Sequence, residues 1–251
     1  MNQKNSAEIT VKSYSEKALP HLASMLDRNT VVMQSLVDRL VSDVKAGKSL
    51  FVFGSGHSGL FPLELYHRAG GASFVIPVVA DYLLPTAGPS VVRVLERTPG
   101  AANAILSRAQ PREGEMIWIS SQSGVNSAVV DFALDAKKRG LHTVAFTSVV
   151  HSSGVPSRHA SGKRLYEVCD ETVDLGGHVG DACVSLSDTL RAGPLSMLGS
   201  VFMGHSILVA ACAVLEASGT SCVYTSVNTP EGESRNQEIE KVASLRDPLL
   251  R

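Results

Sequence analysis

The chain has 251 residues, 44% hydrophobic and 19% charged, so it can bury enough apolar surface to offset the entropy lost on folding, which excludes intrinsic disorder. Its 23 Lys and Arg residues nearly balance 24 Asp and Glu residues, and the net charge is −1. Without a strong positive field, the chain is not expected to bind nucleic acid.

The N-terminal part of the chain is expected to be helical. Between about residues 7 and 46, apolar residues recur mostly every three or four positions. Asn29 or Thr30 offers an N-cap, so the pattern predicts two helices, with Pro20 near a first turn or at a kink. Such an arm needs an apolar surface to cover, its own core or a second subunit. We expect a homo-oligomer, either a dimer or a tetramer.

The start of the chain also lacks a targeting signal. No uninterrupted apolar core follows a basic start, and no stretch reaches the roughly 18 apolar residues that cross a bilayer. We therefore expect a cytoplasmic protein with no membrane partner.

From Gly47 onward, short β-rich runs alternate with helical stretches, which predicts an α/β fold. Most of the runs are nearly continuously apolar, as expected of strands covered on both faces. The predicted strands are Leu50–Phe53, Phe74–Val79, Met116–Ile119, Thr143–Phe146 and Glu171–Leu175. The predicted helices are Leu60–Ala69, about Val91–Ala109, Ser127–Arg139, Leu195–Leu215 and the amphipathic Gln237–Leu245.

We expect one domain, a three-layer αβα sandwich around a five-stranded, parallel, doubly wound sheet of flavodoxin-like type. It would comprise a helical arm (1–47), the core sheet (48–176) and a C-terminal helical extension (177–251).

Two loops after predicted strands carry small residues and hydroxyls. Gly54–Gly59 reads GSGHSG, and Ser120–Ser127 reads SSQSGVNS. Each opens into a helix, and backbone N–H groups and hydroxyls at a helix N-terminus bind phosphate-like anions. Because ligands of such sheets bind beyond the carboxyl ends of the strands, both loops are candidate ligand sites.

The first loop also permits a dinucleotide interpretation. GSGHSG matches G-x-G-x-x-G, and Asp81 follows the second predicted strand, where a ribose-binding acid would lie. A dinucleotide site has no evident use for a second hydroxyl-rich turn, whereas a phosphate monoester needs several neutral donors. The phosphate interpretation is therefore favoured over NAD.

The segments FGSGHSG, ISSQSGVNS and KKRGLHTVAFTS together closely resemble the sugar isomerase (SIS) domain family, over about residues 50–175. The resemblance implies a five-stranded parallel sheet between helices and the binding of a phosphosugar. The family includes phosphoheptose isomerase and muramic acid 6-phosphate etherase. The segments GSGHSGLFPLELYHRAGG and SRHASGKRLYEVCDETVDLGGHVGDA resemble a compact single-domain branch whose biochemistry is mostly uncharacterised.

The resemblance also implies phosphate ligands. Ser58 falls on the serine of the first loop, and Ser55 is the neighbouring hydroxyl of that loop. The matching positions of the second loop are Ser121, Gln122, Ser123 and Asn126, the last where the family usually has Ser or Thr.

The catalytic base that the family resemblance implies is missing. In phosphoheptose isomerase and the etherase a glutamate lies ten residues after the first-loop serine, and here Arg68 occupies that position. Glu64 is one helical turn earlier, so the two side chains would share a helix face. We expect Glu64 to be the base, with Arg68 holding it ionised or meeting a substrate oxygen. The alternative is an exposed structural ion pair.

Several histidines are further candidates. His57, inside the first loop, could donate to phosphate or transfer a proton. His178 follows the last predicted strand, and Asp181 could orient it. His159 lies in a cationic segment with Arg158 and Lys163, where an anion contact and a structural role are equally expected. His205 lies in an apolar helix and is expected in the core or an interface, although related isomerases open the sugar ring with a late-helix histidine.

The sequence indicates neither a metal nor an organic cofactor. The histidines lack the spacing of zinc ligands, Cys169, Cys183, Cys212 and Cys222 form no Cys-x-x-Cys, and no G-x-S-x-G elbow is present.

We predict an enzyme that acts on an amino-sugar phosphate or another sugar phosphate by proton abstraction at C2. The product would arise by aldose–ketose isomerisation or by elimination, as in a lyase or dehydratase. A non-catalytic phosphosugar sensor is the alternative, and an NAD-binding Rossmann protein is a weaker one.

Overall fold

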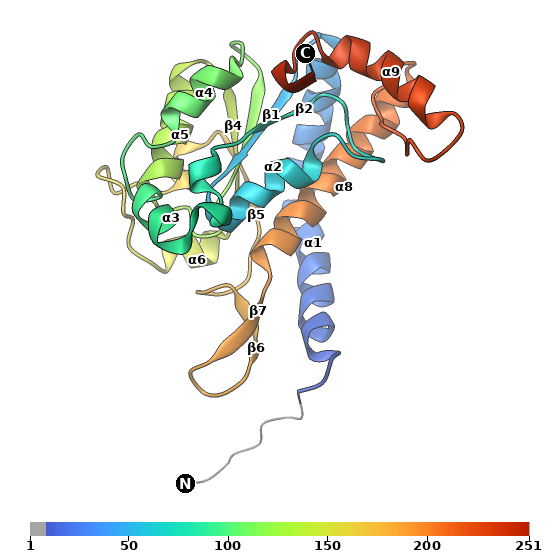
Figure 1. Ribbon diagram of the computed structural model, residues 1–251. Helices are drawn as coiled ribbons and strands as arrows, with labels where there is room; N and C mark the ends of the chain where they lie inside the picture. The colour runs from blue at the N-terminus through green and yellow to red at the C-terminus, as the bar shows by residue number, and fades with distance from the viewer. Residues whose placement is uncertain (1–8, 251) are drawn as a thin grey trace.

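Five parallel strands form the central sheet in the order β2-β1-β3-β4-β5 (Figure 1). The computed structural model describes residues 9–250. The predicted α/β class and its five-stranded, doubly wound parallel sheet are confirmed, and each strand lies within two residues of its predicted bounds. The strands are β1 (Leu50–Gly54), β2 (Val75–Val78), β3 (Met116–Ser120), β4 (His142–Thr147) and β5 (Glu171–Asp174).

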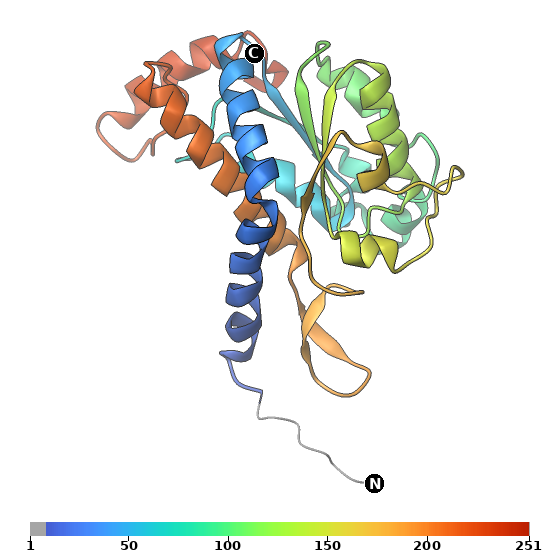
Figure 2. The same ribbon diagram turned by 180° about the vertical axis from the view of Figure 1, so that it is seen from behind.

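Helices cover both faces of the sheet (Figures 1 and 2). On one face lie α1 (Ser13–Lys45), α2 (Leu60–Leu65) and α8 (Ser196–Ala217). On the other lie α3 (Pro89–Leu95), α4 (Asn103–Ala109) and α5 (Ser127–Lys138). Shorter or peripheral helices are α6 (Val149–Ser153), α7 (Leu165–Val168) and α9 (Gly232–Ala243).

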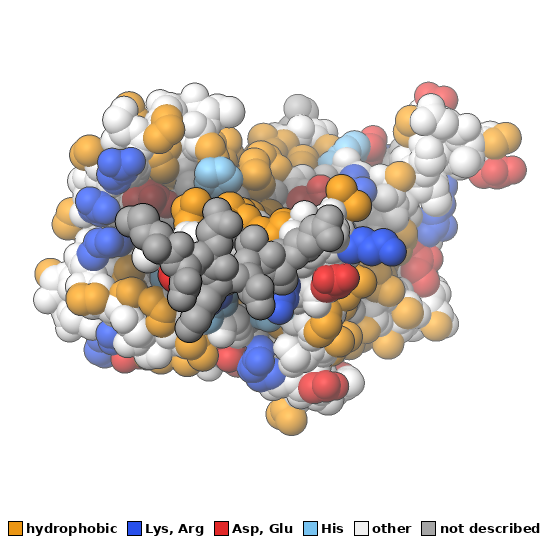
Figure 3. All heavy atoms as spheres, turned by 90° about the horizontal axis from the view of Figure 1, so that it is seen from below, with side chains coloured by type: hydrophobic (Ala, Val, Ile, Leu, Met, Phe, Trp, Pro, Cys, Tyr) orange, Lys and Arg blue, Asp and Glu red, His pale blue; other side chains and the backbone are white. Residues whose placement is uncertain are grey.

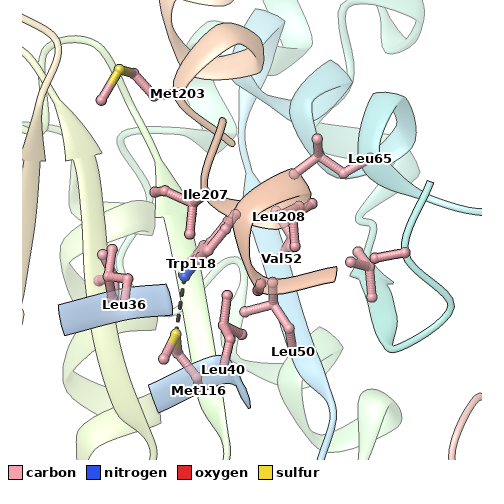
Figure 4. Packing of buried hydrophobic residues seen from close by; sticks show 14 of the residues in the cluster. Leu36, Leu40, Leu50, Val52, Leu65, Met116, Trp118, Met203, Ile207 and Leu208 are labelled. Carbon is pink, nitrogen blue, oxygen red and sulfur yellow. Dashed lines mark hydrogen bonds between the residues drawn. The ribbon is translucent and has the colours of Figure 1, made fainter. Parts of the chain in front are cut away.

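The two faces of the sheet build two apolar cores, because successive strand residues point to opposite sides. Val52 and Trp118 pack with α1 and α8, whereas Phe51 and Phe53 pack with α5. In Figure 4, Trp118 lies among leucines of α1 and apolar residues of α8, and its Nε1 donates to Met116 Sδ at 3.1 Å. Burying each of these large side chains contributes about 1.5–3 kcal/mol.

The N-terminal arm is one continuous helix, so the prediction of two helices was wrong. Asn29 does not cap a helix but lies buried within α1. Its amide donates to Met25 O and Asp174 O, and its Oδ1 accepts from Asp174 N at 2.8 Å. These bonds dock α1 on the end of β5. Pro20 lies inside the helix.

Two other predicted helices are shorter than expected. The helix expected at Leu60–Ala69 ends at Leu65, and His67 has a φ of +39°. The single helix expected at Val91–Ala109 is instead α3 and α4, with Gly100 at a φ of +70° between them.

An antiparallel hairpin that the sequence analysis did not predict projects from the body beside the N-terminal half of α1 (Figures 1 and 2). It consists of β6 (Ala182–Ser185) and β7 (Arg191–Pro194). The Tyr14 hydroxyl donates to Pro194 O at 2.6 Å and joins the hairpin to α1.

Helix α8 is long and apolar enough to cross a membrane by length and composition, so the expectation that no stretch meets this criterion was wrong. A core helix of a folded domain passes the same test, and half of the apolar stretch is buried inside the protein. The helix packs on α1 in one of the two cores.

Candidate functional site

The carboxyl ends of β1 and β3 lie side by side where the chain direction across the sheet reverses, since β1 connects to β2 on one side and β3 lies on the other. Ligands of doubly wound sheets bind at this switch point. Figure 3 looks onto this end from below and shows basic side chains along its left border, on the side of α3 and α5. Both hydroxyl-rich loops start here.

The first loop depends on glycines. A Cβ on Gly54 would lie 2.1 Å from the carbonyl oxygen of Ser58, so the chain can turn this tightly only without a side chain there. Gly56 has a φ of +59°, and a Cβ on it would lie 2.8 Å from Glu96 Oε1. His57 is exposed and Ser58 half-buried, and within residues 9–250 neither side chain forms a hydrogen bond.

The second loop is held by backbone bonds to the end of β4. Ser121 N donates to Phe146 O, and Ser148 N donates to Gln122 O. Ser121 Oγ accepts from Gly124 N at 3.2 Å. Gln122 Oε1 is buried with no hydrogen-bond partner in the described part of the chain.

Ser123 and Asn126 complete this loop. Ser123 is half-buried. Asn126 stands at the N-cap of α5 but makes no capping bond, and its Oδ1 instead accepts from Arg158 Nη1 at 3.0 Å.

Glu96 joins the first loop to the start of α5, and the sequence analysis missed it. Its Oε1 accepts from Ser55 Oγ at 2.9 Å in the first loop, and its carbonyl accepts from Ala128 N in the first turn of α5. Burial raises the pKa of the Glu96 carboxyl, against the opposing effects of the Ser55 hydrogen bond and nearby positive charges. The sequence carried little signal for this role, because the stretch was predicted to continue as helix.

The second carboxylate near the first loop is Glu64. It forms the predicted ion pair with Arg68, although α2 ends at Leu65, and its Oε1 lies 3.6 Å from His205 Nε2 on α8. The Glu64 and Arg68 side chains are 40% and 47% exposed. Burial, aided by the charge of Arg68, lowers the pKa of His205. The structure therefore adds His205, which the sequence analysis considered separately, to the predicted pair of Glu64 and Arg68.

His178 lies at the base of the hairpin. Its Nε2 lies 2.7 Å from Ala182 O and 3.4 Å from Arg191 Nη1. Asp181 does not orient it, because both Asp181 carboxylate oxygens accept hydrogen bonds from Leu195 and Ser196 at the start of α8.

His159 packs against α5. Its Nε2 lies 3.0 Å from Asp131 Oδ1 and its Nδ1 lies 2.7 Å from Ser161 Oγ, so both ring nitrogens have protein partners. These contacts favour a structural role for His159. Asp81, the ribose candidate of the NAD interpretation, is exposed at the start of a short 3-10 turn after β2.

Comparison with known proteins identifies sequence relatives over most of the chain. The SIS domain matches residues 13–148. A UPF0309 protein of Shouchella clausii is 33% identical over 91% of this chain and 94% of its own length. One of Oceanobacillus iheyensis is 30% identical over the same shares.

Solved structures share the fold. A phosphoheptose isomerase from Francisella tularensis superposes with a TM-score of 0.50 at 15% identity, covering 85% of this chain and 100% of that one. A protein of Escherichia coli CFT073, solved as a ligand complex, has a TM-score of 0.51 at 16% identity, covering 82% and 89%.

Proposed function

Because the chain belongs to the SIS domain family, we propose that it binds a sugar phosphate between the carboxyl ends of β1 and β3 and transfers a proton at C2 of that sugar. The observation that carries the proposal is the meeting of two hydroxyl-rich loops at this edge, with Glu96 bonded to the first loop and to the first turn of α5, into which the second loop opens. A phosphate held there would anchor the sugar, and its binding energy would orient C1 and C2 toward a base.

Neutral groups would form most of the phosphate site. We assign the phosphate to the hydroxyls of Ser58, Ser121 and Ser123, to the side chain of Asn126 and to backbone N–H groups of the two loops. Gln122, whose Oε1 is buried without a partner in residues 9–250, would meet a substrate hydroxyl.

The proposed base is Glu64. Ring opening and proton exchange at C2 require proton transfer at different atoms. A second group that can carry a proton is close by, because His205 Nε2 lies 3.6 Å from Glu64 Oε1. Glu96 is the competing candidate, because burial raises its pKa toward the range in which a carboxyl group both takes and returns protons. Transfer at C2 leads to isomerisation or, with a leaving group at C3, to elimination.

A phosphosugar sensor without turnover is the second candidate. One observation favours it: Arg68 stands ten residues after Ser58, and its ion pair with Glu64 stabilises the charged carboxylate and weakens it as a base. A sensor would bind the sugar phosphate and leave its C2 proton in place.

The first experiment is a thermal-shift panel of sugar phosphates, amino-sugar phosphates, free sugars and NAD(P). A ligand at 100 times its Kd stabilises the protein by about 2.7 kcal/mol, which is readily detected. Stabilisation by phosphorylated sugars alone is expected. Stabilisation by NAD(P) alone would overturn the proposal.

The second experiment follows loss of the C2 proton of a bound sugar phosphate in D2O by NMR. We expect Glu64→Gln to slow exchange by about 10²- to 10⁴-fold. If Glu96→Gln slowed exchange to this extent and Glu64→Gln did not, Glu96 would be identified as the base. The matched control is Glu238→Gln, an exposed carboxylate on α9. Binding without exchange in the unmodified protein would identify a sensor.

We also propose that the protein is a homo-oligomer. Leu19 and Val31 of α1 are 65% and 85% exposed, and pairing with a second copy would bury such apolar side chains. A monomeric mass in light scattering at working concentration would contradict this.

A further inference from the structure

Arg158 lies at the border of the second loop and is fixed to it by three hydrogen bonds. Its backbone N–H donates to Val125 O at 2.8 Å, and its carbonyl accepts from Ser127 Oγ at 2.9 Å. Its Nη1 donates to Asn126 Oδ1 at 3.0 Å. Both the backbone and the guanidinium of Arg158 are therefore positioned against the N-terminal end of α5.

The residue that follows strengthens this attachment. His159 Nε2 lies 3.0 Å from Asp131 Oδ1 on α5, and Asp131 Oδ2 also accepts from Gly100 N at 2.9 Å. The segment that carries Arg158 is thus tied to the helix at two neighbouring positions. A side chain placed in advance loses less entropy when it binds a ligand.

The guanidinium of Arg158 has no acidic partner of its own. Across residues 9–250, no carboxylate oxygen lies within ion-pair distance of it, and Asn126 takes one of its five N–H groups. Its charge nevertheless acts on the site, because it opposes the rise in the pKa of Glu96. Arg158 is an exposed cation held beside the second loop by its backbone and by one side-chain hydrogen bond, with donors left for a ligand.

The N-terminus of α5 adds to the attraction for an anion. Asn126 occupies the N-cap without a capping bond, because its Oδ1 faces Arg158 instead. The helix dipole and the guanidinium therefore attract negative charge at the same place.

We propose that Arg158 is the charged ligand of the phosphate and makes the site selective for phosphomonoester dianions. The inference rests on the proposed function, namely that a sugar phosphate binds between the two loops. A phosphate monoester carries close to two negative charges above its second pKa of about 6, whereas a sulfate ester of the same sugar carries one. The hydroxyls of the loops bind either group, and the guanidinium favours the doubly charged one.

Isothermal titration with glucosamine 6-phosphate and glucosamine 6-sulfate at pH 7.5 tests the proposal, with the corresponding fructose esters as a second pair. The unmodified protein should bind the phosphate ester more tightly. Arg158→Gln should raise the Kd of the phosphate ester by about 10- to 100-fold and largely remove the preference over sulfate. Arg158→Lys keeps the charge without the forked donor geometry, so its Kd for the phosphate ester should lie between those of the unmodified protein and of Arg158→Gln.

Arg97→Gln is the matched control. Arg97 also acts electrostatically on Glu96, but it makes no side-chain hydrogen bond to the second loop. It should leave both affinities unchanged. Far-UV circular dichroism and thermal unfolding verify that each variant folds. If Arg158→Gln does not fold, the affinities of Arg158→Lys are used for the test.

Three outcomes overturn the inference. Arg158→Gln binding the phosphate esters as tightly as the unmodified protein would remove Arg158 from the site while leaving the proposed function intact. A loss seen with 6-phosphogluconate but not with glucitol 6-phosphate, which lacks the carboxylate, would assign Arg158 to another part of the ligand. Failure of the unmodified protein to bind any phosphate ester would overturn the proposed function, and this inference with it.

Discussion

Two glutamates at opposite ends of the same sheet have contrasting surroundings. Glu115 lies at the amino end of β3 with its side chain fully buried. Arg246, from the C-terminal segment, donates to both of its oxygens, and the backbone N–H groups of Ser49 and Arg112 donate as well. Glu96, at the carboxyl end, accepts one side-chain hydrogen bond, from Ser55.

The contrast separates a fully paired carboxylate from one that is only partly paired. The charge of Glu115 is fully compensated, so this residue fixes the C-terminal segment to the sheet. Glu96 is desolvated with little compensation, so its pKa rises. Incomplete pairing next to the two hydroxyl-rich loops costs stability, as expected of a carboxyl group kept available for the proposed chemistry.

The largest expected effect is at the amino end of the sheet. Arg246→Ala would leave Glu115 buried without its cation, so the free energy of unfolding in urea should fall by about 3–5 kcal/mol. The control is Lys241→Ala, which removes an exposed pair with Glu238 and should cost less than about 1 kcal/mol. Equal losses in the two variants would mean that Glu115 is not the stronger anchor.

At the carboxyl end, Gly54→Ala should distort the first loop. The new Cβ would lie 2.1 Å from a backbone oxygen, so the chain must move, at a cost of about 1–3 kcal/mol and with loss of the thermal shift given by sugar phosphates. The control is Gly219→Ala, away from the loops, where a Cβ meets open space but the φ of +84° strains a side chain; it should lose some stability and keep the ligand shift. If Gly54→Ala retained the ligand shift, the tight turn would not be needed for binding.

Glu96→Gln should stabilise the protein in a pH-dependent way. A raised folded-state pKa favours folding while the carboxyl is protonated, and this contribution is lost as the pH rises through that pKa. Glutamine stays neutral, so between pH 4 and pH 8 the thermal midpoint of Glu96→Gln should first match that of the unmodified protein, then exceed it as the pH rises, and level off above the folded-state pKa. The exposed Glu238→Gln should show no such trend. A difference that stays constant across this range would refute the assignment of a desolvated carboxyl.

The smallest stability effect is expected at Glu64. Because the pair with Arg68 is exposed, Glu64→Gln should change the free energy of unfolding by no more than about 1 kcal/mol, and added salt should reduce the difference. Arg68→Gln should change the free energy of unfolding by about the same amount as Glu64→Gln. A loss above about 2 kcal/mol in Glu64→Gln would mean that Glu64 holds α2 against α8 through His205.

The sequence predicted the sheet well because buried parallel strands appear as continuous apolar runs, such as Leu50–Phe53. It also placed the two loops, since their glycines and hydroxyls are contiguous. Features that depend on distant partners were missed. Asn29 resembles a local N-cap, yet its partner Asp174 is 145 residues away. Glu96 contacts Ser55 of the first loop and Ala128 of α5, and Arg158 contacts three residues of the second loop, and no spacing in the sequence reveals these contacts.

The bond between Glu115 and Arg246 spans 131 residues of the chain. At about 5–20 residues per second, a ribosome needs roughly 7–26 s to add that stretch. During this time Arg246 has not been synthesised, and Glu115 lacks the cation that pairs with it. A chain that stops before Arg246 therefore contains a sheet with an uncompensated buried charge at the amino end of its central strand. Such a product would unfold readily and be open to proteases, so the stability of the fold depends on synthesis reaching Arg246.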